Sequence, residues 1–312
     1  MTQTAANAQS TNSVLMIRPG RFYPNPETAA DNAFQRDDDR ASDALTQLAR
    51  KEFDAAVQAL RTVGVNVHLF DDTAEPEKPD AVFPNNWIST HHDGRIALFP
   101  MYSALRRRER RQDILEELRK HYRVTEVIDY SAFEDEGCCL EGTGSLVLDH
   151  RNKIAYVSLS NRSNPKVIRR FAEDFSYEPV TFTSIGFNGQ PIYHTNVMMC
   201  ICTAFAMVGL DLIPNKAERQ QARARLEKTG KEIVELSADQ IANFAGNAIE
   251  LQNQGGEKLL VLSSRAAGAL TEEQYERLTR YAELIQLELP TIELGGGSAR
   301  CMMATIHLPP RL

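Results

Sequence analysis

Short apolar runs alternate along the chain with longer segments whose apolar residues recur at helical spacing. This alternation of strands and helices is typical of an α/β protein. The runs that predict strands are VLMIRP (14–19), VNVHLF (65–70), RIALFP (95–100), RVTEVIDY (123–130), GSLVLD (144–149), KIAYVSLS (153–160), PVTFT (179–183), NVMMCICTA (196–204), EIVELS (232–237), AIELQN (248–253), KLLVLSS (258–264) and CMMATIHL (301–308). Helices are predicted near 38–63, 104–122, 164–175, 216–229 and 271–282. The last of these helices has a threonine cap followed by glutamates, a sound helix start.

Five polar residues stand shortly before strands, at nearly constant steps along the chain. They are Asp80, Glu141, His194, Asn247 and Cys301, separated by 61, 53, 53 and 54 residues. Each is followed by strand, strand, helix and strand, and the last unit continues from 301–309 into 14–19, the first helix and 65–70. The pattern predicts five ββαβ units closed into a ring, with the five residues brought to one axis. An open doubly wound sheet is the alternative, but it leaves the constant step unexplained.

The residue types at these positions suit nucleophilic catalysis. A thiol attacks as the thiolate, which a nearby imidazole or positive charge favours. The imidazole in turn needs a third group that fixes its ring and tautomer. Cys301, His194 and Glu141 supply this set. A lone cysteine is most often a core residue, so the interpretation depends on the shared spacing.

Composition narrows the class of protein. The 312 residues are 42% hydrophobic and 25% charged, which is ordinary for a globular protein with a sizeable core. A net charge of −7 argues against a nucleic-acid partner, and we interpret the basic cluster RRRERR (106–111) as a solvated helix face. There is no membrane-length apolar run and no signal-peptide pattern at the N-terminus. We therefore expect a cytoplasmic protein with a disordered tail over 1–12, a single catalytic domain over 13–312, and possible homo-oligomers.

Neither a disulfide framework nor a metal site is predicted. The five cysteines are odd in number and lack a CxxC motif. The pair His91 and His92 followed by Asp93 contains metal-ligating types, but adjacent strand residues point to opposite faces. The sequence HHDG instead predicts a turn between two strands. The remaining histidines, His150 and His307 among them, are scattered without the spacing of a ligand set.

Several motifs resemble those of known enzymes. They are PDAVFPNNW (79–87), LEGTGS (140–145), SLSNRSN (158–164), YHTNV (193–197) and GGGSARCMMATIHLP (295–309). They look like the guanidine-modifying enzymes of the pentein superfamily, which include arginine deiminase, dimethylarginine dimethylaminohydrolase and arginine amidinotransferase. The resemblance is greatest to bacterial amidinotransferase-like hydrolases named for citrulline utilisation. It implies a five-bladed α/β propeller with the active site on its axis and no cofactor.

The resemblance also implies a role for individual residues. Cys301 would be the nucleophile, His194 the general acid and then the general base, and Glu141 the group that orients His194. Arg162 matches the position that binds the carboxylate of an amino-acid substrate. The substrate-binding residues would also include Asp80, Phe83 and Asn247. The glycines before Cys301 would let the backbone pass close to the substrate.

Two positions depart from the deiminase pattern. Deiminases grip a guanidinium with carboxylates where this chain has Asn86 and Asn196. An amide both donates and accepts hydrogen bonds, which suits a neutral ureido group better than two acids would. The same pattern resembles the dihydrolases. We therefore expect a cysteine hydrolase that converts citrulline or arginine to ornithine, ammonia and carbon dioxide.

Four other functions share these features. An arginine deiminase or a dimethylarginine dimethylaminohydrolase would stop at citrulline. An amidinotransferase would pass the same thiouronium to an amine instead of water. A pentein-fold binding protein would use the fold without catalysis.

Overall fold

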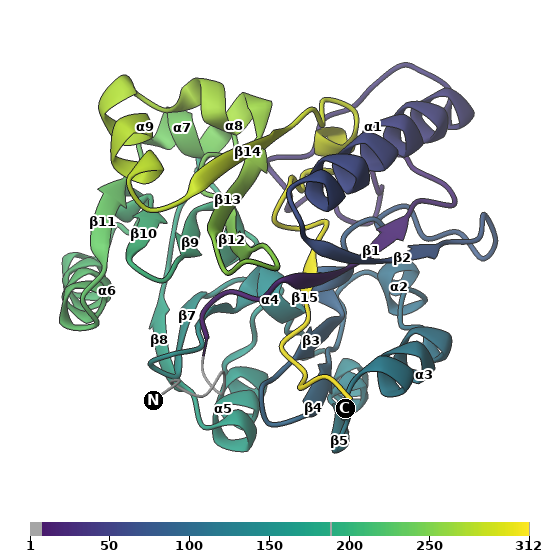
Figure 1. Ribbon diagram of the computed structural model, residues 1–312, viewed down its shortest axis with the longest axis horizontal. Coiled ribbons are helices and arrows are strands. Elements are labelled where there is room, and N and C mark those ends of the chain that lie inside the picture. The colour runs from purple at the N-terminus through teal and green to yellow at the C-terminus, as the bar shows by residue number, and fades with distance from the viewer. Residues whose placement is uncertain (1–7, 188, 312) are drawn as a thin grey trace.

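The computed structural model describes residues 8–187 and 189–311. Within them the strands form five three-stranded sheets around one axis, with the helices at the periphery (Figure 1). The sheets are β15 (Ala304–Thr305), β1 (Ser13–Arg18) and β2 (Asn66–Asp71); β3 (Ile88–Thr90), β4 (Arg95–Leu98) and β5 (Glu126–Asp129); β6 (Val147–Asp149), β7 (Ile154–Ser158) and β8 (Glu178–Phe182); β9 (Met199–Ile201), β10 (Phe205–Val208) and β11 (Glu232–Glu235); and β12 (Ile249–Gln252), β13 (Lys258–Ser263) and β14 (Glu283–Leu287).

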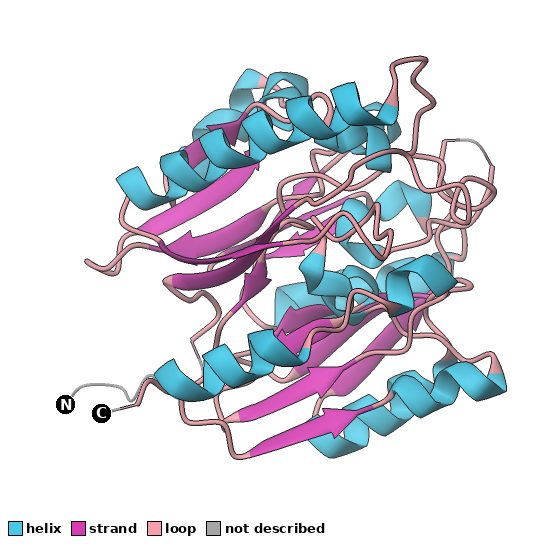
Figure 2. Cartoon of the chain, turned by 90° about the vertical axis from the view of Figure 1, so that its right-hand side faces the viewer, coloured by secondary structure: helices cyan, strands magenta, loops and turns pink. Residues whose placement is uncertain are grey.

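Every sheet pairs its inner strand antiparallel to the middle strand, and its middle strand parallel to the outer one. A parallel pair needs a crossover connection, and here helices supply it on the outside of the ring (Figure 2). The crossover helices are α1 (Ser42–Thr62), α2 (Ala104–Arg107) with α3 (Gln112–His121), α5 (Pro165–Phe175), α6 (Lys216–Lys228), and α8 (Ser264–Ala269) with α9 (Glu272–Thr279). The short helices α4 (Gly142–Ser145) and α7 (Ala238–Ala242) precede the inner strands β6 and β12. The predicted ring of five ββαβ units is confirmed.

Helix α5 shows how the sequence makes one unit. Asn164 caps its N-terminus by accepting from the Lys166 backbone N–H, and Pro165 occupies the first helical turn. Its apolar residues recur at helical spacing and are buried against the sheet; they are Val167, Ile168, Phe171, Ala172 and Phe175. The helix ends at Ser176, which adopts the left-handed conformation.

The ring closes through the two ends of the chain. β15 pairs with β1, Val14 opposite Thr305 and Leu15 opposite Ala304, and β1 then runs parallel to β2. The last unit is therefore completed by the N-terminal segment, as the repeat predicts. Figure 1 shows the yellow C-terminal segment lying beside the purple N-terminal one at the centre of the molecule.

The structure corrects several predicted boundaries. The helix expected over 104–122 is two helices, α2 and α3, separated at 108–111. The strand expected over 301–308 is reduced to β15, and the helix expected over 271–282 ends at Thr279 and is followed by β14, where no strand was predicted. The HHDG turn is present between β3 and β4. The bounds of the inner strands are hard to predict from the sequence, because these strands are short and the residues at their ends form turns near the axis.

The N-terminal tail was expected to be disordered as far as residue 12, and the structure differs over 8–12. The buried Gln9 side chain donates to the carbonyl oxygens of Leu148 (2.9 Å) and Ile201 (3.1 Å) and accepts from the His150 backbone N–H (2.8 Å). Polar sequence alone suggested solvation, but these residues satisfy backbone groups at the ends of inner strands. Residues 1–7 lie outside the described residues.

In the part of the chain that the structure describes, none of the helices has the length and apolar character needed to span a membrane.

Candidate active site

The five residues of the repeat meet at the starts of the inner strands. Cys301 is 2% exposed, and its sulfur accepts hydrogen bonds from the side-chain amides of Asn196 (3.2 Å) and Asn247 (3.3 Å). Asn247 also donates to the Asn196 backbone oxygen at 3.0 Å, which joins two neighbouring units. Two N–H groups aimed at one sulfur suit a sulfur that carries negative charge.

His194 and Glu141 form a buried pair. Nε2 of His194 lies 2.7 Å from Oε2 of Glu141, and both side chains are essentially inaccessible to solvent. Burial raises the pKa of Glu141, but the charges of Arg162, His194 and Arg106 outweigh it and hold that pKa well below its usual range. An ionised carboxylate only accepts, so Nε2 carries the proton and Nδ1 is the basic nitrogen of the ring.

Burial also sets the charge of His194. Loss of hydration lowers its pKa to about 4, although Glu141 acts in the opposite direction. The ring is therefore neutral at pH 7 and able to accept a proton. The adjacent carboxylate then stabilises the imidazolium that forms.

Arg106 is one of the residues of this site that the sequence analysis missed; Glu109, Asp31 and Tyr193 are others. Arg106 was placed on a solvated face with the rest of RRRERR, but it is 2% exposed and points inward. Its guanidinium donates to both oxygens of Glu109 (2.8 and 3.0 Å) and lies 3.6 Å from Asp80 and 3.7 Å from Glu141. The buried Glu109 within the same basic run was a signal, because an acid among arginines at i,i+3 can pair with one of them. The break between α2 and α3 lets both side chains turn toward the axis.

Asn86 and Asp80 contact Arg106 directly. The surrounding hydrogen bonds orient the Asn86 amide so that its oxygen accepts from both terminal nitrogens of Arg106 (2.8 and 3.1 Å), while its nitrogen donates to Asn85 (3.2 Å). Asp80 accepts from the Asn25 side chain at 2.7 Å, and burial raises its pKa. One N–H of the Asn86 amide and its oxygen are thus committed within the protein.

Arg162 lies on the other side of Glu141, 3.6 Å from its carboxylate. Its guanidinium also donates to both oxygens of Asp31 (3.2 and 2.5 Å) and stacks over the Tyr193 ring at 4.7 Å. Asp31 belongs to the loop that precedes α1. The position expected to hold a substrate carboxylate is therefore engaged by a carboxylate of the protein.

Asn196 presents one unpaired atom. Its Oδ1 is buried and has no hydrogen-bond partner among residues 8–187 and 189–311. A buried acceptor without a partner is costly, so it indicates a donor supplied by a ligand or by water. The amide offers an acceptor beside the thiol, and one of its N–H groups donates to Cys301.

Glycines provide close packing around these groups. A Cβ on Gly144 would lie 2.3 Å from the Asn86 amide and 2.8 Å from Nδ1 of His194. Gly296 has a φ of +82°, and a Cβ on Gly297 would lie 2.8 Å from the Phe83 ring. The glycine loop before Cys301 thus makes room for Phe83, which lines the same cavity.

The side chains surround one small cavity of about 10 Å³, the front cavity. Its lining includes eight residues expected or found in the site: Asp80, Phe83, Asn86, Arg106, Arg162, Tyr193, His194 and Cys301. Thr28 and Asn32, from the loop before α1, close it on one side. The Cys301 thiol, the His194 ring and the guanidinium groups of Arg106 and Arg162 therefore face a common space.

Comparison with known proteins places the chain in a family. Residues 18–308 match the family model for eukaryotic N,N dimethylarginine dimethylhydrolase, and the chain belongs to this family, within the pentein superfamily. Among curated protein sequences, none is similar enough to count as a match.

Solved structures share the fold. The N-terminal domain of ArgZ, described as an arginine dihydrolase from the ornithine–ammonia cycle in cyanobacteria, has a TM-score of 0.74 at 17% identity and covers 95% of this chain and 98% of that one. Unliganded AgrE has a TM-score of 0.73 at 16% identity, over 96% of this chain and 40% of that one. DDAH from Pseudomonas aeruginosa, solved as a mutant complexed with citrulline, has a TM-score of 0.65 at 14% identity and covers 95% of this chain and 100% of that one. The pentein fold is therefore shown.

Proposed function

We propose that this protein hydrolyses the guanidino group of arginine through a covalent bond to Cys301. The observation that carries the proposal is the buried thiol held by two amides beside a His194–Glu141 pair and an unpaired acceptor, Oδ1 of Asn196. Asn196 accepts an N–H of the substrate and places its carbon against the sulfur. All three catalytic groups of the sequence prediction keep their roles in the proposal.

The reaction starts when neutral His194 takes the proton of the Cys301 thiol, and the thiolate that forms attacks the guanidinium carbon. A C–S bond forms, and a C–N bond then breaks as the His194 imidazolium gives its proton to the leaving nitrogen. Neutral His194 next removes a proton from water, which adds to the carbon of the thiouronium. The C–S bond breaks, the thiolate returns, and the product at this stage is citrulline.

The charges of the site favour a cationic substrate. Its acidic and basic side chains include those of Asp31, Asp80, Glu109, Glu141, Arg106 and Arg162. Burial raises the pKa of Glu109 to about 8, so this carboxyl is largely neutral at pH 7. Asp31, Asp80 and Glu141 still outnumber the two guanidinium groups, so an entering guanidinium offsets an excess of acid. One N–H of Asn86 and one N–H of Asn196, the amides expected to hold a ureido carbonyl, already donate to Asn85 and Cys301. The site thus supports arginine as the first substrate better than citrulline.

A second hydrolysis of citrulline in the same site would give ornithine. In total, arginine and two waters yield ornithine, two molecules of ammonia and one of carbon dioxide. Asn86 and Asn196 stand where a deiminase has carboxylates, and this supports the second step. Citrulline lacks the positive charge of arginine, and an uncharged amide does not depend on that charge to bind the neutral ureido group. The structural likeness to ArgZ, described as an arginine dihydrolase, agrees with it.

A second candidate is hydrolysis of N,N-dimethylarginine to citrulline and dimethylamine, which the family description favours. The same thiouronium forms, and only the leaving nitrogen differs. Nothing in the chemistry of Cys301 and His194 separates the two.

Product analysis tests the proposal. The protein is incubated separately with arginine, dimethylarginine and citrulline, and the products are identified by mass spectrometry, with Cys301→Ala as the control. Ornithine from arginine supports the dihydrolase. Citrulline that accumulates from dimethylarginine alone contradicts it and favours the second candidate. Full turnover by Cys301→Ala, or no product from any substrate, rejects the guanidino hydrolase itself and favours a binding protein.

A further inference from the structure

We propose that His92, His150 and His307 form a binding site for a transition-metal dication such as Zn²⁺, on the face opposite the active site. The inner strands explain the location. Residues that precede these strands make the active site, and residues that follow them meet at the other end of the axis. His92 follows β3, His150 follows β6 and His307 follows β15.

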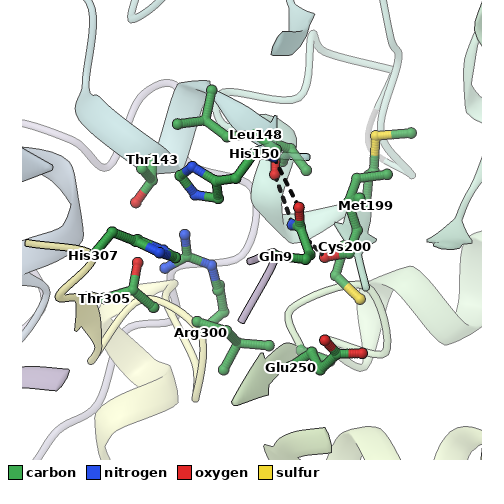
Figure 3. A pocket seen from close by; sticks show the side chains of 14 residues that line it. Gln9, Thr143, Leu148, His150, Met199, Cys200, Glu250, Arg300, Thr305 and His307 are labelled. Carbon is green, nitrogen blue, oxygen red and sulfur yellow. Dashed lines mark hydrogen bonds between the residues drawn. The ribbon is translucent and has the colours of Figure 1, made fainter. Parts of the chain in front are cut away.

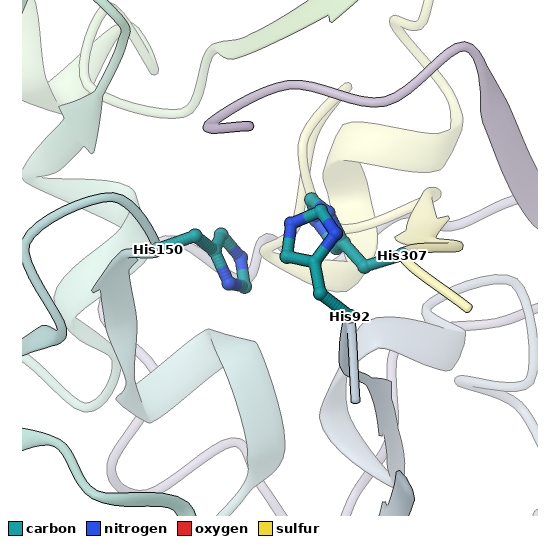
Figure 4. Close-up of side chains that lie close together, drawn as sticks. All are labelled: His92, His150 and His307. Atoms are coloured by element: carbon teal, nitrogen blue, oxygen red, sulfur yellow. The ribbon is translucent and has the colours of Figure 1, made fainter. Parts of the chain in front are cut away.

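The three side chains converge from separate units. One ring nitrogen of each histidine lies within 4.8 Å of one ring nitrogen of each of the others. Figure 4 shows the rings approaching a common point from different elements. Nitrogens that share one zinc ion at about 2.0–2.1 Å lie roughly 3.3 Å apart, so binding requires a closure of about 1.5 Å or less. Side-chain rotation at the half-exposed His92 can supply much of it.

Outer contacts already orient two of the rings. Nε2 of His92 lies 2.9 Å from the Ala8 carbonyl oxygen, which only accepts, so this nitrogen carries the proton and Nδ1 keeps a lone pair. Nδ1 of His150 hydrogen-bonds the Tyr177 hydroxyl at 2.8 Å, which leaves Nε2 for a ligand. Metal-binding histidines characteristically use their second nitrogen in this way.

His307 provides the independent observation. It is 5% exposed, and neither of its ring nitrogens has a hydrogen-bond partner within the described ranges. Its ring centroid lies 4.1 Å from that of His150 and 4.7 Å from that of His92. A buried imidazole without partners is costly unless a ligand satisfies it. A shared metal ion would satisfy one ring nitrogen of His307 and the free nitrogens of its neighbours at once.

Two cavities give access to the cluster. His150 and His307 line a rear cavity of about 40 Å³ on the axis, together with Gln9 and Arg300 (Figure 3). His92 and His307 line a groove of about 590 Å³ between the N-terminal and C-terminal segments. The groove supplies an entry path and room for a solvent ligand in an open coordination position.

The ligand type and the charges around the cluster point to a transition metal. The charged neighbours are Arg300, Lys153 and Asp93, of which only Asp93 favours a cation. Imidazole ligands suit zinc, copper and nickel ions. These ions bind nitrogen strongly enough to tolerate the neighbouring positive charges, which calcium and magnesium, as ions that prefer oxygen ligands, would not.

A bound ion would tie together distant parts of the chain. It would join the β3–β4 turn, the β6–β7 turn and the segment after β15. The segment that begins at Ala8 would be held indirectly through His92. The expected consequence is a more stable ring, because a ligand that binds only the folded state shifts unfolding to higher temperature.

Equilibrium dialysis with Zn²⁺, followed by elemental analysis, tests the site. The Cys301→Ser variant is the background, because the active-site thiol is itself a zinc ligand. We expect one equivalent of zinc in this background and a loss of affinity in His307→Ala larger than the roughly 100-fold that loss of an outer-shell partner costs. Tyr177→Phe, which removes only such a partner, should lower the affinity by about 10- to 100-fold. His121→Ala, at an exposed histidine that pairs with Glu117, should retain zinc and serves as the matched control.

A Co²⁺ titration provides a readout that does not depend on activity. A tetrahedral or five-coordinate visible spectrum in the Cys301→Ser background that His307→Ala abolishes supports the site. If His307→Ala fails to fold, as judged by circular dichroism, His92→Ala replaces it because His92 lies in a turn. Equal zinc binding by the background and these variants, or no binding by the background, overturns the proposal. Because neither experiment measures turnover, failure here leaves the proposed hydrolase unaffected.

Discussion

The two ends of the propeller axis both hold buried polar side chains, but they differ in charge. At the front, Cys301, His194 and Glu141 are surrounded by guanidinium and carboxylate groups, and nearly every atom has a partner. At the rear, the three histidines are neutral and His307 has no partner among the described residues. Residues that precede inner strands form the front end, and residues that follow inner strands form the rear end.

The difference shows what each end is suited for. Paired charges in a buried site set the ionisation of catalytic groups, because each charge favours one state of its neighbour. Neutral imidazoles with free lone pairs do not favour one ionisation state of their neighbours, but they can coordinate a cation. The repeat brings equivalent residues together at each end of the axis, and the types of those residues decide the chemistry.

The largest expected effect concerns the catalytic pair at the front. Glu141→Gln removes the charge that stabilises the His194 imidazolium, so kcat should fall by about 10² to 10⁴. Steady-state turnover of arginine measures it. His150→Gln at the rear is the matched change and should leave kcat nearly unchanged. Equal losses in the two variants would mean that the ends are not functionally distinct.

The next effect concerns the charge network. Arg106→Met leaves buried Asp80, Glu109 and Glu141 without their shared cation, and should destabilise the fold by about 3–5 kcal/mol. The neighbouring Arg107→Met removes a partly exposed ion pair with Glu134 and should cost less than about 1 kcal/mol. Urea unfolding compares the two. Similar costs would support the original interpretation of the whole RRRERR run as a solvated face.

Packing at the front gives a smaller effect. Gly144→Ala places a methyl group against the Asn86 amide and His194, and should cost about 1–3 kcal/mol together with a loss of kcat. Gly268→Ala, where no atom of the described chain lies within 4 Å of the added Cβ, should be neutral or stabilising. Thermal unfolding and turnover measure both. A neutral Gly144→Ala would show that the two side chains can move away.

The smallest effect is the dependence of stability on pH. An unfolded histidine binds a proton near pH 6.5, whereas folded His194 does so only near 4. Between these values the unfolded state binds more protons, so the stability present above pH 6.5 is lost as the pH falls, by about 1.4 kcal/mol per pH unit for each such residue. His150 and His307 add in the same direction. His150→Gln should make the slope of urea stability against pH shallower, and an unchanged slope would contradict the assignment of neutral buried rings.

Much of the front end could be predicted. The step between Asp80, Glu141, His194, Asn247 and Cys301 is recorded in the chain itself, since a repeated unit places equivalent residues at equivalent points. The rear end was missed although the same repeat applies to it. His92, His150 and His307 look scattered in sequence, and they become a cluster only when strand ends, rather than strand starts, are aligned.

The sequence by itself determined the class of fold and the closure of the ring, because hydrophobic period and repeat length are properties of the order of residues. It also predicted Cys301, His194 and Glu141 as the catalytic set. Only the tertiary structure decided where Arg106 points, what Asn86 and Asn196 hold, and which nitrogen of each histidine is free. These outcomes depend on burial and on partners that the fold brings together, which range from Glu109 beside Arg106 in sequence to Cys301, 105 residues from Asn196. Desolvation makes an unpaired charge or donor costly, so each side chain turned to the partner that the fold brought within reach.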